Sequence, residues 1–149
     1  MLNKALCTSI KDDYETPQYL FNELNEEFHF TVDVCARADN TKCARFYFPE
    51  IDGLVQSWEG EVCLMNPPYG RRVNKWIEKA YKESQNGTIV VGLLLARTDT
   101  KWFHDFILGK AEIRFLKGRL KFNNVLNSAP FPSMIVIWRG RDKASAKGG

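Results

Sequence analysis

Apolar residues recur at helical spacing in three stretches of the chain. A first helix is predicted to begin after Thr16, which can cap it, and Pro17, which suits a first turn. Its apolar face comprises Leu20, Phe21, Leu24 and Phe28. A second helix is expected over 73–84, ended by Asn86-Gly87, with an apolar face made of Trp76, Ile77, Ala80 and Tyr81. A third, short helix is expected near 99–108.

Apolar runs of strand type lie between and after these helices. The clearest is 89–96, which is almost wholly apolar and is therefore predicted to be a central strand covered on both faces. Val62-Cys63-Leu64-Met65 is a shorter buried run that stops abruptly at two prolines. Further strands are predicted at 30–36, 45–48, 111–116, 120–122 and 134–138.

Strands that alternate with helices and end in a β-ribbon predict an α/β domain. Its sheet is expected to be mostly parallel, with an antiparallel C-terminal β-ribbon. Ligands bind such sheets beyond the carboxyl ends of their strands, and Ala36 and Asn66 each follow a predicted strand. One crevice is therefore expected to contain both. The pattern predicts a single domain over 1–149, with flexible ends at 1–12 and 140–149.

Composition narrows the class of protein without identifying it. The chain has 149 residues, of which 44% are hydrophobic and 26% charged, as in ordinary globular proteins. No apolar run is long enough to span a bilayer, and the first residues show no secretory signal pattern. The four cysteines form no C-x-x-C pair, which disfavours zinc and fits reduced thiols in a cytoplasmic setting. The net charge of +3 does not by itself indicate a nucleic-acid partner.

The tetrapeptide Asn66-Pro67-Pro68-Tyr69 carries the most specific chemistry in the sequence. Its two prolines fix an extended, rigid loop that would present one amide, backbone carbonyls and one aromatic ring. That set suits a planar substrate with an exocyclic amine, because it offers acceptors for two N–H bonds and a ring to stack on. The structural alternative is a proline turn that merely ends a strand.

The tetrapeptide resembles the catalytic loop, (D/N/S)-P-P-(Y/F/W), of amino-methyltransferases that use S-adenosylmethionine. Over 12–138 the chain resembles the phage-type DNA N6-adenine methyltransferase (Dam) family, small single-domain enzymes of bacteriophages and prophages. Five segments carry this resemblance, in the same order and spacing: Tyr14-Glu15-Thr16-Pro17; Asp33-Val34-Cys35-Ala36 with Asn40; Asp52-Gly53-Leu54 with Trp58; Asn66-Pro67-Pro68-Tyr69-Gly70; and Gly118-Arg119-Leu120-Lys121-Phe122 with Ala129-Pro130-Phe131-Pro132-Ser133.

The resemblance implies a compact, Rossmann-like methyltransferase sheet with S-adenosylmethionine as cofactor and no metal. By resemblance, Thr16, Pro17, Asp33 and Ala36 lie around the methionine end of the cofactor, together with Asn66, and Asp52 contacts its ribose or adenine. The segment after the first predicted strand departs from the superfamily, because it contains no glycine. Purely structural roles stay open, with Thr16 as a helix cap and Asp52 as a turn residue.

The chemistry expected at the loop is activation of a poor nucleophile. The Asn66 oxygen and the Pro67 carbonyl would accept both N–H bonds of the adenine amine, which frees its lone pair and stabilises the developing positive charge. Pro68 would keep the loop rigid, and Tyr69 would stack on the base. Because the target amine lies inside the duplex, the base must be flipped out or presented single-stranded.

Basic residues near the loop are expected to bind DNA phosphates. They fall in two groups, Arg71, Arg72 and Lys75 after the loop, and Lys117, Arg119 and Lys121 in a run that also holds Arg114, Phe115 and Phe122. A solvated charged face is the structural alternative. No separate target-recognition domain is expected, so the DNA sequence preference is unreadable. The resemblance places the protein in the cytoplasm of a bacterial host, encoded by a phage or prophage, where it would shield phage DNA from nucleases.

Two other functions stay open. Glutamine-amide methylation of a protein uses the same Asn-Pro-Pro-Tyr loop, but enzymes of that kind have the glycine-rich cofactor loop that is missing here. A catalytically silent DNA-binding relative, in which the cofactor pocket has decayed, is the other alternative, which the absent glycines leave open. Cofactor binding would separate the silent relative from both enzymes.

Overall fold

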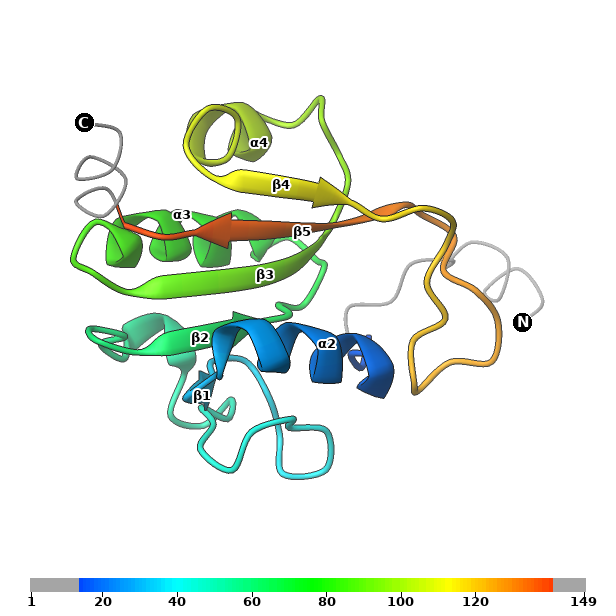
Figure 1. Ribbon diagram of the computed structural model, residues 1–149, viewed down its shortest axis with the longest axis horizontal. Coiled ribbons are helices and arrows are strands. Elements are labelled where there is room, and N and C mark those ends of the chain that lie inside the picture. Colours follow the sequence, from blue (N-terminus) through cyan, green and yellow to red (C-terminus); the bar gives the residue numbers. More distant parts are fainter. Residues whose placement is uncertain (1–13, 141–149) are drawn as a thin grey trace.

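The computed structural model describes residues 14–140, which form a single α/β domain around one five-stranded sheet (Figure 1). The sheet order is β1-β2-β3-β5-β4. The strands are β1 (Val32–Asp33), β2 (Val62–Met65), β3 (Ile89–Leu95), β4 (Glu112–Phe115) and β5 (Ser133–Trp138). The first three strands are parallel, whereas β5 runs antiparallel to both β3 and β4. The predicted α/β class and the antiparallel C-terminal ribbon are thus confirmed, in a mixed sheet.

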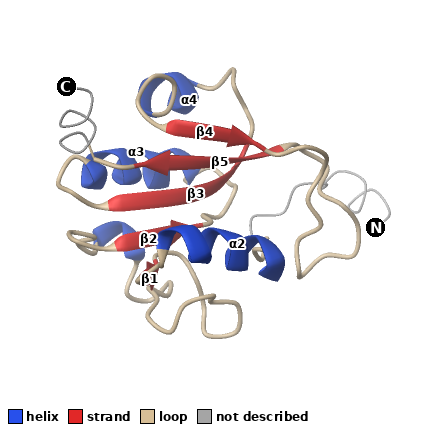
Figure 2. Ribbon diagram, in the orientation of Figure 1, coloured by secondary structure: helices blue, strands red, loops and turns tan. Residues whose placement is uncertain are grey.

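Helices cover both faces of the sheet (Figure 2). Helix α2 (Gln18–Phe28) packs on one face, and α3 (Val73–Ser84) and α4 (Lys101–Phe106) pack on the other. Alternate residues of β3 and β5 enter the two resulting clusters, so that Val91 and Leu93 face α2 while Val90 and Leu94 face α3. Burial on both faces explains why β3, at the centre of the sheet, reads as a continuous apolar run.

The strongest sequence patterns predicted their elements correctly. Strand β2 and helix α3 begin and end at the predicted residues, and Gly87 follows α3 with a positive φ of 88°. The third helix is shorter than predicted, because it begins after Thr100, whose hydroxyl accepts a hydrogen bond from the Phe103 amide. Trp76 lies in the core, as expected for the apolar face of its helix, and so does Trp58.

Three of the weaker strand predictions need correction. The predicted strand 30–36 is reduced to the two residues of β1, and 45–48 contributes one parallel bridge, from Phe46 to Asp33. The segment 120–122 is not a strand. Leu120 and Phe122 are buried while Lys121 is exposed. Burial of one side of the segment thus explains its alternating apolar and polar residues, although the segment does not pair with a neighbouring strand.

The prediction that Thr16 caps the first helix is also wrong. The N-cap of α2 is Pro17, and no side chain caps the helix. The predictions for 1–12 and for the tail beyond Gly140 lie outside the described residues. None of the helices between residues 14 and 140 is long and apolar enough to cross a membrane.

Candidate active site at the carboxyl edge of the sheet

The carboxyl ends of the three parallel strands meet at one edge of the sheet. Asp33 pairs with Leu64 in the register of β1 and β2, and Met65 pairs with Gly92 in that of β2 and β3. The loops after β1 and β2 therefore begin side by side, whereas β3 continues to Leu95 before its own loop begins. Two sets of cavities open among them, one on each side of the loop that follows β2.

The first set is a pair of adjoining cavities between the ends of β1 and β2, which we call the β1–β2 crevice. Their volumes are about 220 and 130 Å³. Both are lined by Cys35, Ala36, Pro49 and Pro68. Asp52 and Arg72 line the larger cavity, and Tyr14, Arg37, Asn40 and Asn66 line the smaller one. The structure thus brings Ala36, Asp52, Asn66 and Pro68 together, although they come from three separate segments.

Close backbone packing places Asp52 in this crevice. A Cβ atom at Gly53 would lie 2.1 Å from the Val34 carbonyl oxygen and 3.1 Å from the Trp76 ring, so only glycine fits against the end of β1. Asp52 has a positive φ of 55°, and its carboxylate accepts a hydrogen bond from the Leu54 amide at 3.0 Å. The chain has no glycine directly after β1, but Gly53, from a later segment, packs closely against the end of that strand.

Hydrogen bonds within the protein fix both the nitrogen and the oxygen of the Asn66 side-chain amide. The nitrogen Nδ2 donates to the Tyr14 carbonyl at 2.6 Å and to Thr16 Oγ1 at 2.9 Å. The oxygen Oδ1 accepts from the Tyr69 hydroxyl at 3.0 Å. Since a carbonyl can only accept, the nitrogen must face Tyr14, and the orientation of the amide is fixed.

Tyr69 is buried, contrary to the expectation that the loop presents a free ring. Its ring is 8% exposed and packs against Tyr14, with centroids 5.7 Å apart, and against the edge of Phe131. Its hydroxyl also donates to the Leu93 carbonyl at 2.8 Å. Burial raises the pKa of Tyr69 well above its usual value, so the hydroxyl stays protonated and can donate.

The 14–16 segment that holds Asn66 is itself fixed by the loop between β4 and β5. The Glu15 amide donates to Asn124 Oδ1 at 2.8 Å, and the Asn123 amide donates to the Glu15 carbonyl at 3.1 Å. The rings of Tyr14 and Phe122 lie 4.9 Å apart. The segment 14–16 and the loop between β4 and β5 thus meet beside the loop after β2.

Three predicted cofactor residues do not line the β1–β2 crevice. Asp33 is buried, and its carboxylate accepts hydrogen bonds from the Lys42 amide at 3.1 Å and the Cys35 amide at 3.4 Å. Burial raises the pKa of Asp33 to about 6, and these two amides oppose that rise. Thr16 and Pro17 are buried at the start of α2, where Thr16 contacts Asn66.

A second cavity of about 220 Å³ lies between the ends of β2 and β3, and we call it the β2–β3 cavity. Its lining includes Tyr69, Gly70, Leu95, Arg97 and Trp102. Sequence reasoning did not select Arg97 or Trp102 for the site. The signal available was position, because Arg97 follows the central strand closely, just as Asn66 follows β2.

The predicted DNA-contact residues are exposed at the surface. Arg71, Arg72 and Lys75 lie around the start of α3, and Lys117, Arg119 and Lys121 lie on the loop between β4 and β5. Gly118 has a positive φ of 78°, as expected for a glycine turn beside Arg119. Arg114 does not belong to this group, because it forms ion pairs with Glu27 and Glu112.

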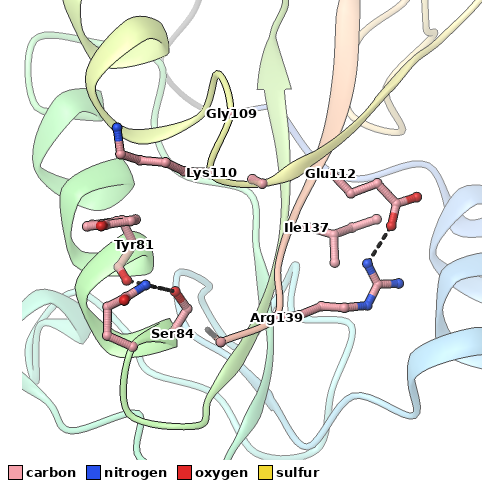
Figure 3. A pocket seen from close by; sticks show the side chains of 10 residues that line it. Tyr81, Ser84, Gly109, Lys110, Glu112, Ile137 and Arg139 are labelled. Atoms are coloured by element: carbon pink, nitrogen blue, oxygen red, sulfur yellow. Dashed lines mark hydrogen bonds and ion pairs between the residues drawn. The ribbon is translucent and has the colours of Figure 1, made fainter. Parts of the chain in front are cut away.

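A larger cavity lies apart from all these residues. It has a volume of about 790 Å³ and lies at the opposite edge of the sheet, between the end of α3 and the strands β4 and β5 (Figure 3). Tyr81, Ser84 and Lys110 line it, and its Arg139–Glu112 ion pair already neutralises the charge on one wall. It contains no predicted site residue. Among residues 14–140, no cluster of His, Cys, Asp and Glu could hold a metal ion.

A family model and known proteins match this chain in sequence. A family model described as DNA N-6-adenine-methyltransferase (Dam) matches residues 4–146. The DNA N-6-adenine-methyltransferase of Haemophilus phage HP1 (strain HP1c1) is 35% identical over 121 residues, which cover 78% of this chain and 69% of the phage protein. A protein of Escherichia coli (strain K12), named "Putative methyltransferase YfdM", is 31% identical over 67 residues, which cover 40% of this chain and 74% of that protein.

Proposed function

The chain belongs to the phage-type DNA N-6-adenine-methyltransferase (Dam) family, and from this premise we propose that it transfers a methyl group from S-adenosylmethionine to the N6 amine of adenine in DNA. The observation that carries the proposal is the Asn66 amide. Its nitrogen donates to two acceptors of the protein, so the oxygen, which also accepts from the Tyr69 hydroxyl, is the atom that can accept a substrate N–H. The Asn-Pro-Pro-Tyr loop would thus be the catalytic loop.

The β1–β2 crevice fits the proposed cofactor in its chemistry. It combines the small Ala36, apolar surface from Phe48 and Pro49, and the Asp52 carboxylate, which can accept from ribose hydroxyls. When bound, the cofactor supplies a methyl group already activated on a sulfonium. Asp33, Thr16 and Pro17 would not contact the cofactor but would stabilise the segments that line the crevice. The sheet would be a compact version of the Rossmann-like methyltransferase sheet.

The acceptor base would occupy the β2–β3 cavity. This cavity borders Tyr69 and Gly70 on the side of the loop away from the β1–β2 crevice, so the loop lies between donor and acceptor. In this cavity a flipped base would contact the exposed edge of Tyr69. Its N6 amine would reach toward the β1–β2 crevice, which Asn66 lines, so that the Asn66 oxygen and the Pro67 carbonyl could accept the N6 hydrogens. Trp102 offers a second aromatic surface in the same cavity.

The exposed basic residues would hold the DNA backbone around this site. They flank it on two sides, from the start of α3 and from the loop between β4 and β5. Duplex DNA is therefore the proposed partner. Because the HP1 relative is a phage protein, we place this activity in the cytoplasm of a bacterial host, where methylation would protect phage DNA from nucleases.

The test is methyl transfer from labelled S-adenosylmethionine to unmethylated duplex DNA, followed by digestion to nucleosides and mass analysis. The wild-type protein should yield N6-methyladenine. Asn66→Ala should lower kcat by about 10²- to 10³-fold, as loss of a preorganised transition-state contact does, while cofactor affinity stays within twofold. Asn86→Ala, a matched change in the exposed turn after α3, should leave both unchanged. Cofactor binding without any product from DNA would refute the proposal and favour an amide substrate.

A further inference from the structure

The Asn66 amide has two orientations that differ only by exchange of its nitrogen and oxygen. In the observed orientation all three of its contacts are satisfied, by the Tyr14 carbonyl, the Thr16 hydroxyl and the Tyr69 hydroxyl. In the other orientation two carbonyl oxygens would lie 2.6 Å apart, and Oδ1 would face away from the Tyr69 donor. The three contacts therefore select one orientation.

The Tyr69 hydroxyl has one proton and two acceptors within reach, Leu93 O at 2.8 Å and Asn66 Oδ1 at 3.0 Å. When a substrate N–H approaches Oδ1, the Tyr69 hydroxyl can keep its hydrogen bond to the Leu93 carbonyl, so that no buried donor is left unpaired. The Tyr69 hydroxyl can thus orient the Asn66 oxygen in the free protein and give up that hydrogen bond when a substrate N–H binds the oxygen. A phenylalanine ring could pack in the same place but has no hydroxyl to orient the amide.

We propose that the Tyr69 and Thr16 hydroxyls are positioning groups, which hold the Asn66 amide with its oxygen toward the reacting amine. This inference rests on the proposed function, and it changes the roles of two residues. Tyr69 would act through its hydroxyl rather than by stacking its buried ring on the base. Thr16, which is 5% exposed and does not line the β1–β2 crevice, would contact Asn66 rather than the cofactor.

The two hydroxyls can be removed with little change in side-chain volume, as Tyr69→Phe and Thr16→Val. The matched controls are Tyr81→Phe, at the opposite edge of the sheet, and Thr88→Val, which removes another buried threonine hydroxyl, one that donates to the Trp58 carbonyl at 2.7 Å. Thr16→Ser keeps the hydroxyl and serves as the conservative rescue. Steady-state kinetics with S-adenosylmethionine and duplex DNA should be measured below the melting temperature of every variant.

Tyr69→Phe and Thr16→Val should each lower kcat by about tenfold or more, since small misplacement of a catalytic group has effects of this size. Both KM values should stay within twofold, because neither hydroxyl binds a substrate in this proposal and Tyr69→Phe keeps the ring. Thr16→Ser and the two controls should retain kcat within about twofold. If Tyr69→Phe does not fold, the comparison of Thr16→Val with Thr16→Ser and Thr88→Val decides the question.

Other outcomes would overturn the inference. Thr16→Val with a raised KM for S-adenosylmethionine and an unchanged kcat would make Thr16 a cofactor contact. Tyr69→Phe with wild-type kcat would return Tyr69 to a stacking role. These results differ from failure of the proposed function, in which the wild-type protein itself makes no N6-methyladenine.

Discussion

Replacing Gly53 with alanine tests whether backbone packing against β1 shapes the proposed cofactor site. The added Cβ would lie 2.1 Å from the Val34 carbonyl oxygen, whereas real Cβ atoms do not come closer than about 3.0 Å to such neighbours. The two segments must therefore separate by about 0.9 Å. The Gly53 carbonyl would move as well, and it accepts the buried Trp58 indole N–H at 2.9 Å.

Overpacking of this kind costs about 1–3 kcal/mol. For a domain of this size, a loss of about 2 kcal/mol lowers Tm by roughly 4–8 °C. The shift also moves Asp52 away from the position proposed for the cofactor. Loss of a hydrogen bond to a charged group costs about 1.5–3 kcal/mol, so on the proposed function affinity for S-adenosylmethionine should fall about tenfold or more. Thermal unfolding followed by circular dichroism and cofactor titration by calorimetry measure the two effects.

Gly92→Ala is the matched control, because it makes the same substitution at a buried position. The nearest atom to its added Cβ is the Met65 Cε atom at 3.3 Å, the end of a flexible side chain. Stability should therefore change by less than about 1 kcal/mol, and cofactor affinity should not change. If Gly53→Ala matches Gly92→Ala in both Tm and affinity, the role given to Gly53 is wrong.

Three further predictions concern DNA binding, pH and stability. Arg119→Ala should weaken DNA binding, measured by fluorescence anisotropy, and reduce the magnitude of the slope of log affinity against log salt concentration by about one. Lys110→Ala, at the opposite edge of the sheet, should change neither. An unchanged slope for Arg119→Ala would show that Arg119 does not contact DNA phosphates. The pKa of Asp33 is raised to about 6 from an ordinary 3.8, so the folded state binds this proton more tightly than the unfolded state does. Protonated Asp33 therefore stabilises the fold at low pH, and this stabilisation should be lost as pH rises from about 4 to 6. Urea unfolding of Asp33→Asn should lack that part of the pH dependence, and an identical pH profile would contradict the assignment. Within the described residues the buried Ser133 hydroxyl has no hydrogen-bond partner, so Ser133→Ala should leave the free energy of unfolding unchanged or raise it by up to about 1 kcal/mol; a clear loss of stability would show that the hydroxyl is satisfied.

The parts of the fold that sequence predicted are those with strong local periodicity. Helix α3 and strands β2 and β3 are specified by apolar positions a few residues apart, so their bounds follow from short windows. The segment 120–122 shows where such windows fail. Its residues alternate because Leu120 and Phe122 pack into a cluster of side chains from distant segments. Whether a neighbouring strand lies alongside to form hydrogen bonds cannot be predicted from the segment's own residues.

The candidate site divides in the same way. Positions directly after strands could be predicted, and Ala36 and Asn66 do line one crevice. Three features could not be predicted: the use of the Tyr14 carbonyl, the burial of Tyr69 and the contact from Thr16 to Asn66. Each depends on a contact across about fifty residues or more, and the first involves a backbone atom that has no signature in residue type.

The way Asn66 is held has a consequence for when activity can arise during synthesis. Asn66 is oriented by segment 14–16, which is in turn fixed by Asn123 and Asn124, more than a hundred residues later. Contacts of such long range form late, because the intervening chain must first be ordered. A nascent chain that has exposed the Asn-Pro-Pro-Tyr loop therefore still lacks the support for its amide. We expect the catalytic geometry to form only once the loop between β4 and β5 has left the ribosome and β5 has joined the sheet.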